Sequence, residues 1–208
     1  MKSLSAITLA AGLTLSMAAT AGPVTVNFEG LANNTAIGNY YNGGAGTNYG
    51  ISFGANARAF VGGVTGTFTG EPAPGDTIML WTSGNSTSAS MTGGWTGSLS
   101  FYYAGTAALT VSVLDAAGTS LASSGSLAGV GGGNCGLGVA LCHWNQYTID
   151  FSGTASSVSF LGAAGLIGVD NVTFGSTGGG GNVPEPGSLA LAGLALAVLG
   201  ARALRKPA

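Results

Sequence analysis

The spacing of apolar residues between Gly22 and Gly175 constrains the fold more than any other feature of the sequence. Short runs in which apolar and polar residues alternate, such as 24–28, 109–114 and 168–174, are separated by Gly, Asn, Ser and Pro. Alternation with a period of two marks strands that bury one face, and no run ahead of the C-terminal tail has the period of an amphipathic helix. The sequence therefore predicts an all-β domain.

The number and spacing of these segments narrow the architecture. Turn signals recur about every ten residues, and many short strands at that spacing indicate a β-sandwich or a barrel. No unit repeats at a fixed period, which argues against a solenoid or a propeller. We therefore expect a jelly-roll-like β-sandwich over residues 22–175, with strands at 24–28, 51–53, 57–61, 77–81, 98–103, 109–114, 120–126, 146–151, 158–161 and 168–174.

Few charges remain once the two ends of the chain are set aside. Charged residues make up 6% of the chain, and Arg58 is the only lysine or arginine between residues 22 and 182. Six acids against this one arginine give the region a net charge of −5. A domain with one cation cannot neutralise a row of phosphates, so the composition excludes nucleic acid as a partner. Acids without basic neighbours leave room for a cation such as Ca²⁺.

The N-terminus has the three parts of a secretory signal peptide. Lys2 precedes an apolar run over residues 4–19, and the Ala-Thr-Ala of residues 19–21 forms a cleavage site. A basic start, an apolar core and such a site direct export. The run is short for a membrane span of about 20 residues, and Pro23 follows closely. We therefore expect a cleaved signal over residues 1–21 rather than a permanent membrane helix.

The C-terminus has a second segment of the kind that directs a chain to a membrane. A Gly-rich linker, residues 176–182, leads into Pro184, Glu185 and Pro186, and an apolar stretch follows. Leu and Ala dominate this stretch and predict a helix over about 188–204. The chain closes with three basic residues, Arg202, Arg205 and Lys206. Basic residues beside a membrane helix stay cytoplasmic, which places the domain on the far side. An ordinary single-pass anchor with a chance Pro-Glu-Pro is the alternative.

The order of motif, apolar helix and basic end resembles the PEP-CTERM sorting domain, whose Pro-Glu-Pro is matched by Pro184, Glu185 and Pro186. The resemblance covers about residues 183–206 of a sorting and anchoring segment at 183–208. It implies a Gram-negative bacterium that makes an exopolysaccharide or biofilm matrix, and a membrane protease, exosortase, that removes the tail. It also implies export through the inner membrane, transient anchoring by the C-terminal helix, and a final place at the cell surface or outside the cell.

Cys135 and Cys142 are the only cysteines. An even pair in an exported chain favours a disulfide, whereas a metal site needs more ligands than the neighbouring His143 supplies. Adjacent residues of a strand point to opposite faces, so His143 is poorly placed to act as a base for Cys142. We expect a disulfide between Cys135 and Cys142 and a structural or solvated histidine.

Two acids are expected to meet at one end of the sandwich. Glu29 ends the first predicted strand and Asp170 lies in the last. The segment 167–174 resembles the closing strand of lectin-like and carbohydrate-binding jelly-roll modules, several of which hold a structural Ca²⁺. The resemblance implies Glu29, Asp170 and Asn171 as calcium ligands, with backbone carbonyls and water completing the shell. The alternative is that both acids are exposed or accept hydrogen bonds from backbone N–H groups.

Aromatic rings are the usual platform for sugars. The pairs Tyr40-Tyr41 and Tyr102-Tyr103 each place one ring on either face if they lie in strands. One ring of each pair is therefore expected in the core. Trp95 is flanked by glycines and is the ring expected in an exposed loop.

These features predict an exported protein of the cell surface or of the exopolysaccharide matrix that is structural or carbohydrate-interacting and not an enzyme. A surface rich in Ser, Thr, Asn and Gly suits sugars better than charged partners. The alternative is a secreted hydrolase acting on polysaccharide, because glycosidases use two facing carboxyls and the domain has six acids. None of these acids stands in a catalytic pattern. Acids that converge in one cleft would favour the hydrolase, and scattered acids would favour a binding module.

Overall fold

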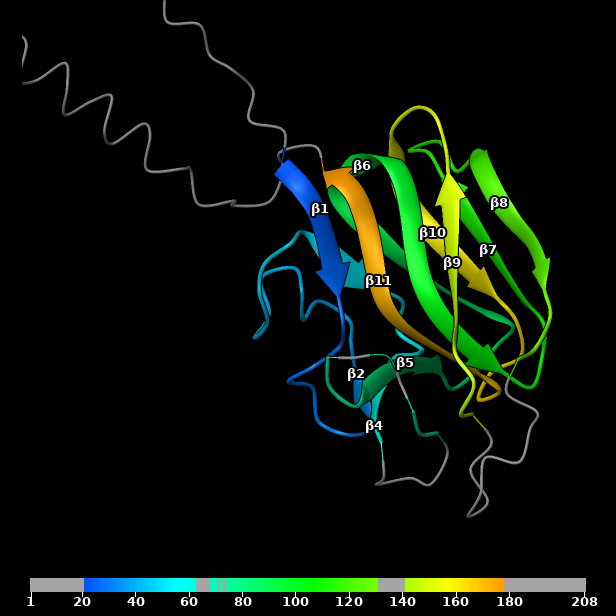
Figure 1. The fold of residues 1–208 in the computed structure, drawn as a ribbon. Helices are drawn as coiled ribbons and strands as arrows, with labels where there is room; N and C mark the ends of the chain where they lie inside the picture. The colour runs from blue at the N-terminus through cyan, green and yellow to red at the C-terminus, as the bar shows by residue number, and fades with distance from the viewer. Residues whose placement is uncertain (1–20, 63–67, 71, 73, 131–140, 178–208) are drawn as a thin grey trace, which may run out of the picture.

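The computed structural model describes residues 21–62, 68–70, 72, 74–130 and 141–177 (Figure 1). All regular structure within these ranges is β, which confirms the all-β class. The strands are β1 (Ala21–Val26), β2 (Thr35–Ala36), β3 (Ile51–Phe53), β4 (Ala57–Val61), β5 (Thr77–Trp81), β6 (Ser86–Gly105), β7 (Leu109–Leu114), β8 (Ser120–Leu127), β9 (Asn145–Asp150), β10 (Ala155–Leu161) and β11 (Ile167–Thr177).

The predicted signal peptide at 1–21 and the predicted sorting segment at 183–208 fall largely outside the described ranges. Residues 1–20 of the predicted signal, the residues beyond Thr177 and the helix predicted at 188–204 all lie there. Within the described ranges, no helix has the length and apolar character that crossing a membrane requires.

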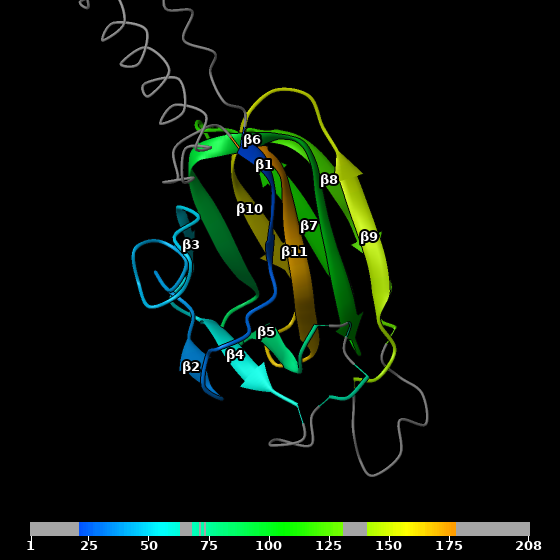
Figure 2. The ribbon, with the colours of Figure 1, turned by 60° about the vertical axis from the view of Figure 1, so that its left-hand side comes forward.

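The strands pack as two layers, and one long strand belongs to both. In the first layer, the N-terminal half of β6 pairs with β3 and β10, and the order continues through β7 to β8. In the second layer, the C-terminal half of β6 pairs with β9 and β11. Strand β11 also pairs with β1 and with β5, which leads to β4 and β2. Figure 2 shows β6 passing between the layers at the top of a β-sandwich.

Glycines allow β6 to turn from one layer into the other. Residues 91–94 of β6 lie opposite the single residue Ser156 of β10. Gly93 and Gly94 have φ angles of 81° and 70°, values that residues with a Cβ rarely adopt. A Cβ on Gly94 would also overlap the carbonyl oxygen of Ala155. The Gly-Gly pair thus bends the strand while its neighbours stay in the ladder.

Trp95 follows this bend and is fully buried, so the expectation that it lies in an exposed loop is wrong. Its ring makes edge-to-face contacts with Phe151 and Phe174, with centroids 6.1 and 5.0 Å away. The indole N–H has no hydrogen-bond partner among the described residues. The flanking glycines therefore belong to a bent strand that directs the ring into the core.

The alternating segments bury the faces that the sequence predicted. Every second residue of β7 is buried. In β6, Phe101 and Tyr103 are buried between the layers, whereas Tyr102 is half-buried on the opposite face. The expected split of the Tyr102-Tyr103 pair is therefore confirmed. Burying such large side chains stabilises the fold by about 1.5–3 kcal/mol each.

A smaller apolar core lies on the outer side of the second layer. Strand β5 is buried on both faces, with Met79 and Trp81 in the main core and Ile78 and Leu80 in the smaller one. The smaller core also contains Ala104 of β6 and two side chains from loops, Phe68 and Leu141. A continuous apolar run is expected of a strand that is covered on both sides.

Two loop segments, residues 68–70 and 141–144, cover this smaller core, and we call them the strap. Phe68 and Leu141 form a parallel bridge, and the backbone N–H of Thr69 donates to the Leu141 carbonyl at 2.9 Å. The indole Nε1 of Trp144 donates to the Thr69 carbonyl at 3.3 Å. A Cβ on Gly168 of β11 would come within 3.0 Å of the Trp144 ring. The strap therefore lies directly on the sheet.

A tyrosine-rich loop packs beside β3. Its Tyr41 ring is buried and stacks on Tyr49 with centroids 6.2 Å apart. The Tyr41 hydroxyl makes no hydrogen bond of good distance and angle with the described residues, although the nearby Phe28 backbone, a weak hydrogen-bond partner, acts to lower its pKa. Burial, followed by the neighbouring Tyr40, raises the pKa of Tyr41 above its ordinary value. Folding therefore favours the neutral hydroxyl. Ionisation of Tyr41 does not weaken the fold below a pH of about 10, the pKa in the unfolded chain, and destabilises it increasingly as the pH rises above that value toward the raised pKa.

Replacing Tyr41 with phenylalanine is expected to stabilise the protein by about 1 kcal/mol, because it removes a buried polar group without changing the packing. For a domain of this size the melting temperature should rise by about 3 °C, as measured by circular dichroism. Tyr49→Phe, at a half-buried ring, is the matched control and should change little. A loss of stability in Tyr41→Phe would contradict the prediction and indicate a bound partner such as water.

Candidate functional site

The outward side of β9, β6, β11 and β1 forms a polar face, which we call the outer face. Its side chains stand in cross-strand rows. Tyr102 of β6 lies opposite Asp170 of β11 and Gln146 of β9. The row above joins three hydroxyl residues, Thr173, Ser100 and Thr148, and Thr25 of β1 extends it through a 2.8 Å hydroxyl–hydroxyl hydrogen bond to Thr173.

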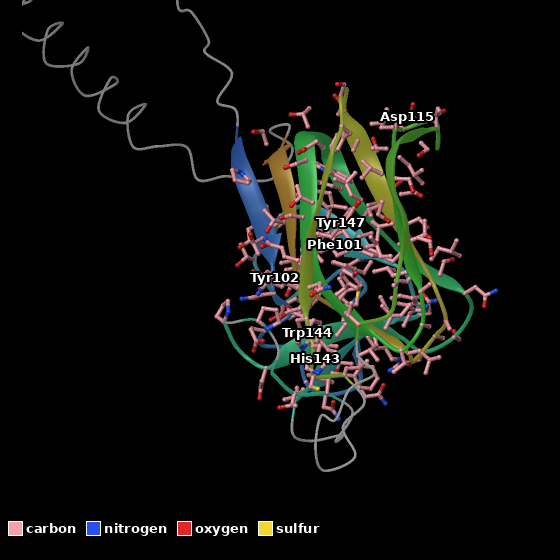
Figure 3. The ribbon with its side chains drawn as sticks, turned by 45° about the vertical axis from the view of Figure 1, so that its right-hand side comes forward. Phe101, Tyr102, Asp115, His143, Trp144 and Tyr147 are labelled. Carbon is pink, nitrogen blue, oxygen red and sulfur yellow. The ribbon has the colours of Figure 1, made fainter. Side chains whose placement is uncertain are left out.

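Tyr102 is the aromatic ring of the outer face. Phe101 and Tyr147, its sequence and cross-strand neighbours, pack between the layers with centroids 6.2 Å apart. Figure 3 shows Tyr102 on the other side of β6, with Trp144 and His143 of the strap below it. Trp144 precedes Gln146 by two residues and is half-buried. The strap thus closes one end of the outer face, while the hydroxyl row lies farther from it.

The outer face carries no positive charge among the residues just named. Arg58, the only lysine or arginine in the described ranges, lies on β4, where its guanidinium donates to the Asn34 carbonyl at 2.7 Å. Asp150 stands beyond the hydroxyl row, opposite Ser98. The face therefore combines hydroxyls, an amide, a ring and the exposed carboxylate of Asp150, which together donate and accept hydrogen bonds without attracting anions.

Sequence reasoning named Tyr102 but missed the rows around it. The polar residues recur at every second position within 98–102 and 146–150, and that pattern was available from the sequence. The register that brings Gln146, Tyr102 and Asp170 side by side was not, because it depends on pairings between distant strands.

The predicted calcium ligands lie around a break in the second layer. Strand β1 leaves β11 after Val26, and the β11–β6 register shifts between Asp170 and Thr173. At this break Phe28 and Asn171 have φ angles of 61° and 48°. Positive φ is uncommon for asparagine and costly for a bulky residue such as Phe28. The surrounding structure therefore holds these two residues in an unfavourable backbone conformation at the break.

Glu29 fills this break with hydrogen bonds. Its carboxylate accepts from the backbone N–H of Thr77 at 2.8 Å and from the Thr77 hydroxyl at 3.1 Å. Asp170 is buried and accepts from the Asn171 backbone N–H at 2.7 Å. The Asn171 amide donates to the Pro72 carbonyl at 3.4 Å. Each acid thus accepts a hydrogen bond from a backbone N–H group, as the alternative to calcium ligation describes.

The calcium site at Glu29, Asp170 and Asn171 stays a prediction. Within the described ranges, no group of three or more His, Cys, Asp or Glu side chains could hold a metal ion, so backbone oxygens and water would have to supply most of the six to eight ligands. Free Ca²⁺ at 100 times the dissociation constant of such a site would raise the free energy of unfolding by about 2.7 kcal/mol.

Calcium binding predicts a melting temperature about 8 °C higher in millimolar CaCl₂ than in EDTA. MgCl₂ at equal ionic strength is the control, because a site built for Ca²⁺ should respond less to it. An unchanged melting temperature in CaCl₂ would leave Glu29 and Asp170 as hydrogen-bonding residues alone.

Asp115 lies apart from the acids around the break. Asp115 lies in the β7–β8 turn, and its carboxylate accepts from the backbone N–H groups of Ala117 and Thr119 at 2.9 and 2.8 Å. Figure 3 shows this turn at the end of the sandwich opposite His143. The side chains of Glu29 and Asp115 thus serve separate parts of the backbone.

Only one of the two cysteines of the predicted disulfide lies in the described ranges. Cys142 belongs to the strap and has no free thiol. Cys135 lies outside the described ranges. The pairing of Cys135 with Cys142 therefore stays a prediction.

Residues 182–206 match the model of the PEP-CTERM protein-sorting motif. The chain carries a PEP-CTERM sorting motif. The match includes Pro184, Glu185 and Pro186 and confirms the resemblance seen in the sequence. No curated protein matches the chain.

Solved structures of family 29 carbohydrate-binding modules are similar to the sandwich. One module shares 15% identity at a TM-score of 0.43, over 73% of this chain and 86% of its own. A variant of the module CBM29-2 shares 14% identity at a TM-score of 0.45, over 76% of this chain and 94% of its own. Because these TM-scores are below 0.5, no property of those modules is assigned to this chain.

Proposed function

We propose that this chain is an exported protein that exosortase releases from its C-terminal anchor, and that its sandwich binds a neutral polysaccharide at the cell surface or in the extracellular matrix. The sorting motif at 182–206 supports the first part. The outer face, with Tyr102 beside the exposed Gln146 and next to the hydroxyl row, is the observation that supports the second. The proposed role is binding without catalysis.

The chemistry of the outer face suits a sugar chain. Hydroxyl groups of Ser100, Thr148 and Thr173 both donate and accept hydrogen bonds, as sugar hydroxyls do. Tyr102 adds an apolar ring face with a polar tip. Four strands give the face a width of about 14 Å, at roughly 4.8 Å between neighbours. A surface of this kind accommodates an extended polymer better than a single small molecule.

The charge of the domain argues for a neutral polymer. Asp150 is exposed on the outer face. Arg58, the one described lysine or arginine, lies on β4 and donates to the Asn34 carbonyl. Like charges across an interface are unfavourable. A polyuronate or sulfated polymer would meet an acid and find no base, whereas a neutral polymer meets neither penalty.

Affinity electrophoresis of the purified protein tests binding. Gels are cast with soluble neutral glucan, neutral galactan, polyuronate, or the polysaccharide isolated from the producing strain. We expect a neutral polymer to retard migration at both low and high salt, because the contacts are not ionic. Migration unchanged by every polymer would contradict polysaccharide binding, and retardation by polyuronate alone would contradict the neutral ligand.

Intact mass tests the sorting part separately. Protein recovered from the envelope and the medium of the producing strain should lack residues 1–21 and the tail beyond Pro184, Glu185 and Pro186. A mass that retains residues 189–208, found only in the inner membrane, would contradict exosortase processing.

A further inference from the structure

The first layer of the sandwich has an outward side of its own. Val113, Val158 and Ala89 in its strands are buried, so the residues on either side of each point away from the core. We call the side that these outward residues form the hydroxyl face, and it lies across the sandwich from the outer face (Figure 2). Its members are Ser52 of β3, Ser86, Ser88 and Ser90 of β6, Ser157, Ser159 and Leu161 of β10, Thr110, Ser112 and Leu114 of β7, and Ser120, Ser123 and Ser126 of β8.

The register of the strands aligns these side chains in rows that run across the layer. The middle row consists of Ser88, Ser159, Ser112 and Ser123. The two flanking rows consist of Ser52, Ser90, Ser157, Leu114 and Ser120, and of Ser86, Leu161, Thr110 and Ser126. Neighbours within a row are about 4.8 Å apart, and the rows are about 7 Å apart. The hydroxyl face therefore repeats one chemical group at regular intervals in two directions.

The hydroxyls in the middle of this face are not used by the fold. Among the described residues, the side chains of Ser88, Ser112 and Ser159 have no hydrogen-bond partner. The edge strands differ, since Ser52 of β3 accepts from the Asn42 amide at 2.8 Å. A serine hydroxyl has one donor and two acceptor positions. The middle row can therefore both donate to and accept from a ligand that lies on it.

The hydroxyl face carries no charge. Strands β3, β7, β8 and β10 and residues 86–94 of β6 contain no Asp, Glu, Lys, Arg or His. Leu161, which is 50% exposed, stands between Ser86 and Thr110 in its row. Neutral sugars present hydroxyls and apolar C–H groups together, and this face offers a partner for each. A charged ligand would lose hydration without gaining an opposite charge, so the chemistry fits a neutral sugar.

The dimensions of the face favour a polymer over a single sugar. A row that crosses five strands spans about 19 Å, and a side chain recurs about every 4.8 Å along it. This interval is close to the length of a hexopyranose unit in an extended chain. A chain that lies across the strands therefore meets a side chain at each sugar. The face has no aromatic ring among its members, so we expect it to bind more weakly than the outer face.

We propose that the hydroxyl face is a second site for neutral polysaccharide, and that one domain joins two polymer chains, one on each side of the sandwich. The inference rests on the proposed polysaccharide binding by the outer face. The two sheets of a sandwich lie about 10 Å apart, so chains on opposite sides do not obstruct each other. Two sites on one rigid domain link separate chains. The protein thereby cross-links the polymer instead of only attaching to it.

Light scattering from dilute neutral glucan and neutral galactan, titrated with the purified protein, tests cross-linking. Scattering should pass through a maximum and fall when protein is in excess, because saturated chains no longer share a domain. Ser159→Glu places a charge at the centre of the middle row, and Ser88→Glu does so at an exposed position of that row. Ser152→Glu, exposed in the turn between β9 and β10, is the matched control outside both faces.

We expect Ser159→Glu and Ser88→Glu to lower the scattering maximum at least fivefold. Both should still be retarded in affinity electrophoresis, because the outer face is intact, and Ser152→Glu should behave like the natural protein. Melting temperatures measured on the same samples identify a variant that fails to fold. Ser88→Glu keeps the test open if Ser159→Glu does so, because an exposed side chain tolerates the change.

Three outcomes would overturn the second site. Undiminished scattering in both row variants, or retardation of the natural protein without any cross-linking, would do so and leave the proposed function intact. Sedimentation that shows an oligomer of the natural protein, dissociated by Ser159→Glu, would assign the hydroxyl face to a second copy of the chain. A natural protein that is neither retarded by these polymers nor cross-links them would overturn the proposed polysaccharide binding as well.

Discussion

Replacing Gly94 with alanine should destabilise the protein by about 3 kcal/mol and lower its melting temperature by about 10 °C. The new Cβ would overlap the Ala155 carbonyl oxygen and come within 2.8 Å of Thr154 Cγ2. Alanine at a φ of 70° adds about 1 kcal/mol of backbone strain. Thermal unfolding followed by circular dichroism measures the effect. The change is large because it strikes the bend through which β6 joins the two layers.

Gly97 offers a matched control three residues away in the same strand. It also has a positive φ, 89°, but a Cβ there would meet no atom within 4 Å. Gly97→Ala should therefore cost only the backbone strain, about 1 kcal/mol or roughly 3 °C. Equal losses in the two variants would contradict the close approach of Gly94 to β10.

Replacing Tyr102 with alanine should weaken binding to the neutral polysaccharide at least tenfold, which corresponds to about 1.4 kcal/mol. Tyr102 is the ring of the outer face, and a sugar stacked on it loses its apolar contact when the ring is removed. Stability should change little, because the ring is half-buried and faces outward. Affinity electrophoresis at graded polymer concentrations measures the dissociation constant.

Two further variants separate the ring from its position. Tyr102→Phe keeps the ring and should retain most of the affinity, unless the hydroxyl carries the contact. Tyr49→Ala removes an equally half-buried tyrosine beside β3, away from the outer face, and should bind normally. Normal binding by Tyr102→Ala together with weak binding by Tyr49→Ala would move the site to the tyrosine loop.

Segments with a strong alternating pattern could be predicted from the sequence. The run at 109–114 became β7 with every second residue buried. The apolar run at 77–81 became β5, buried throughout. Its burial on both faces required the strap, whose two segments lie about 70 residues apart in the sequence. Local pattern thus identified the strands but not what covers them.

The N-terminal half of β6 was missed for a physical reason. Its inward positions include Thr87 and Ala89, small or polar side chains that carry little hydrophobic signal. The glycines that follow are typical of a loop. In the structure they bend a strand, because pairing with β3 and β10 holds both flanks in the sheet. Tertiary context therefore decided a segment whose own sequence was ambiguous.

The candidate site was predictable only in part for a similar reason. The sequence predicted that Glu29 and Asp170, as residues of the first and last strands, lie near each other. It did not reveal that Glu29 bonds to Thr77 of β5, since that contact depends on the break between β1 and β11. The rows of the outer face likewise depend on register, which a slip of one residue would turn to the other side of the sheet.

The position of β11 has a consequence for the timing of export. β11 is the last strand in the sequence, yet it lies inside the second layer and pairs with β1, β5 and β6. A chain that crosses a membrane from its N-terminus delivers this strand last. Until it arrives, β1 has no partner strand among the described residues, and the pairing of first with last strand is the slowest kind to form. The first layer, whose strand pairs do not include β11, can form before then, but the second layer cannot close until the last strand of the domain has crossed.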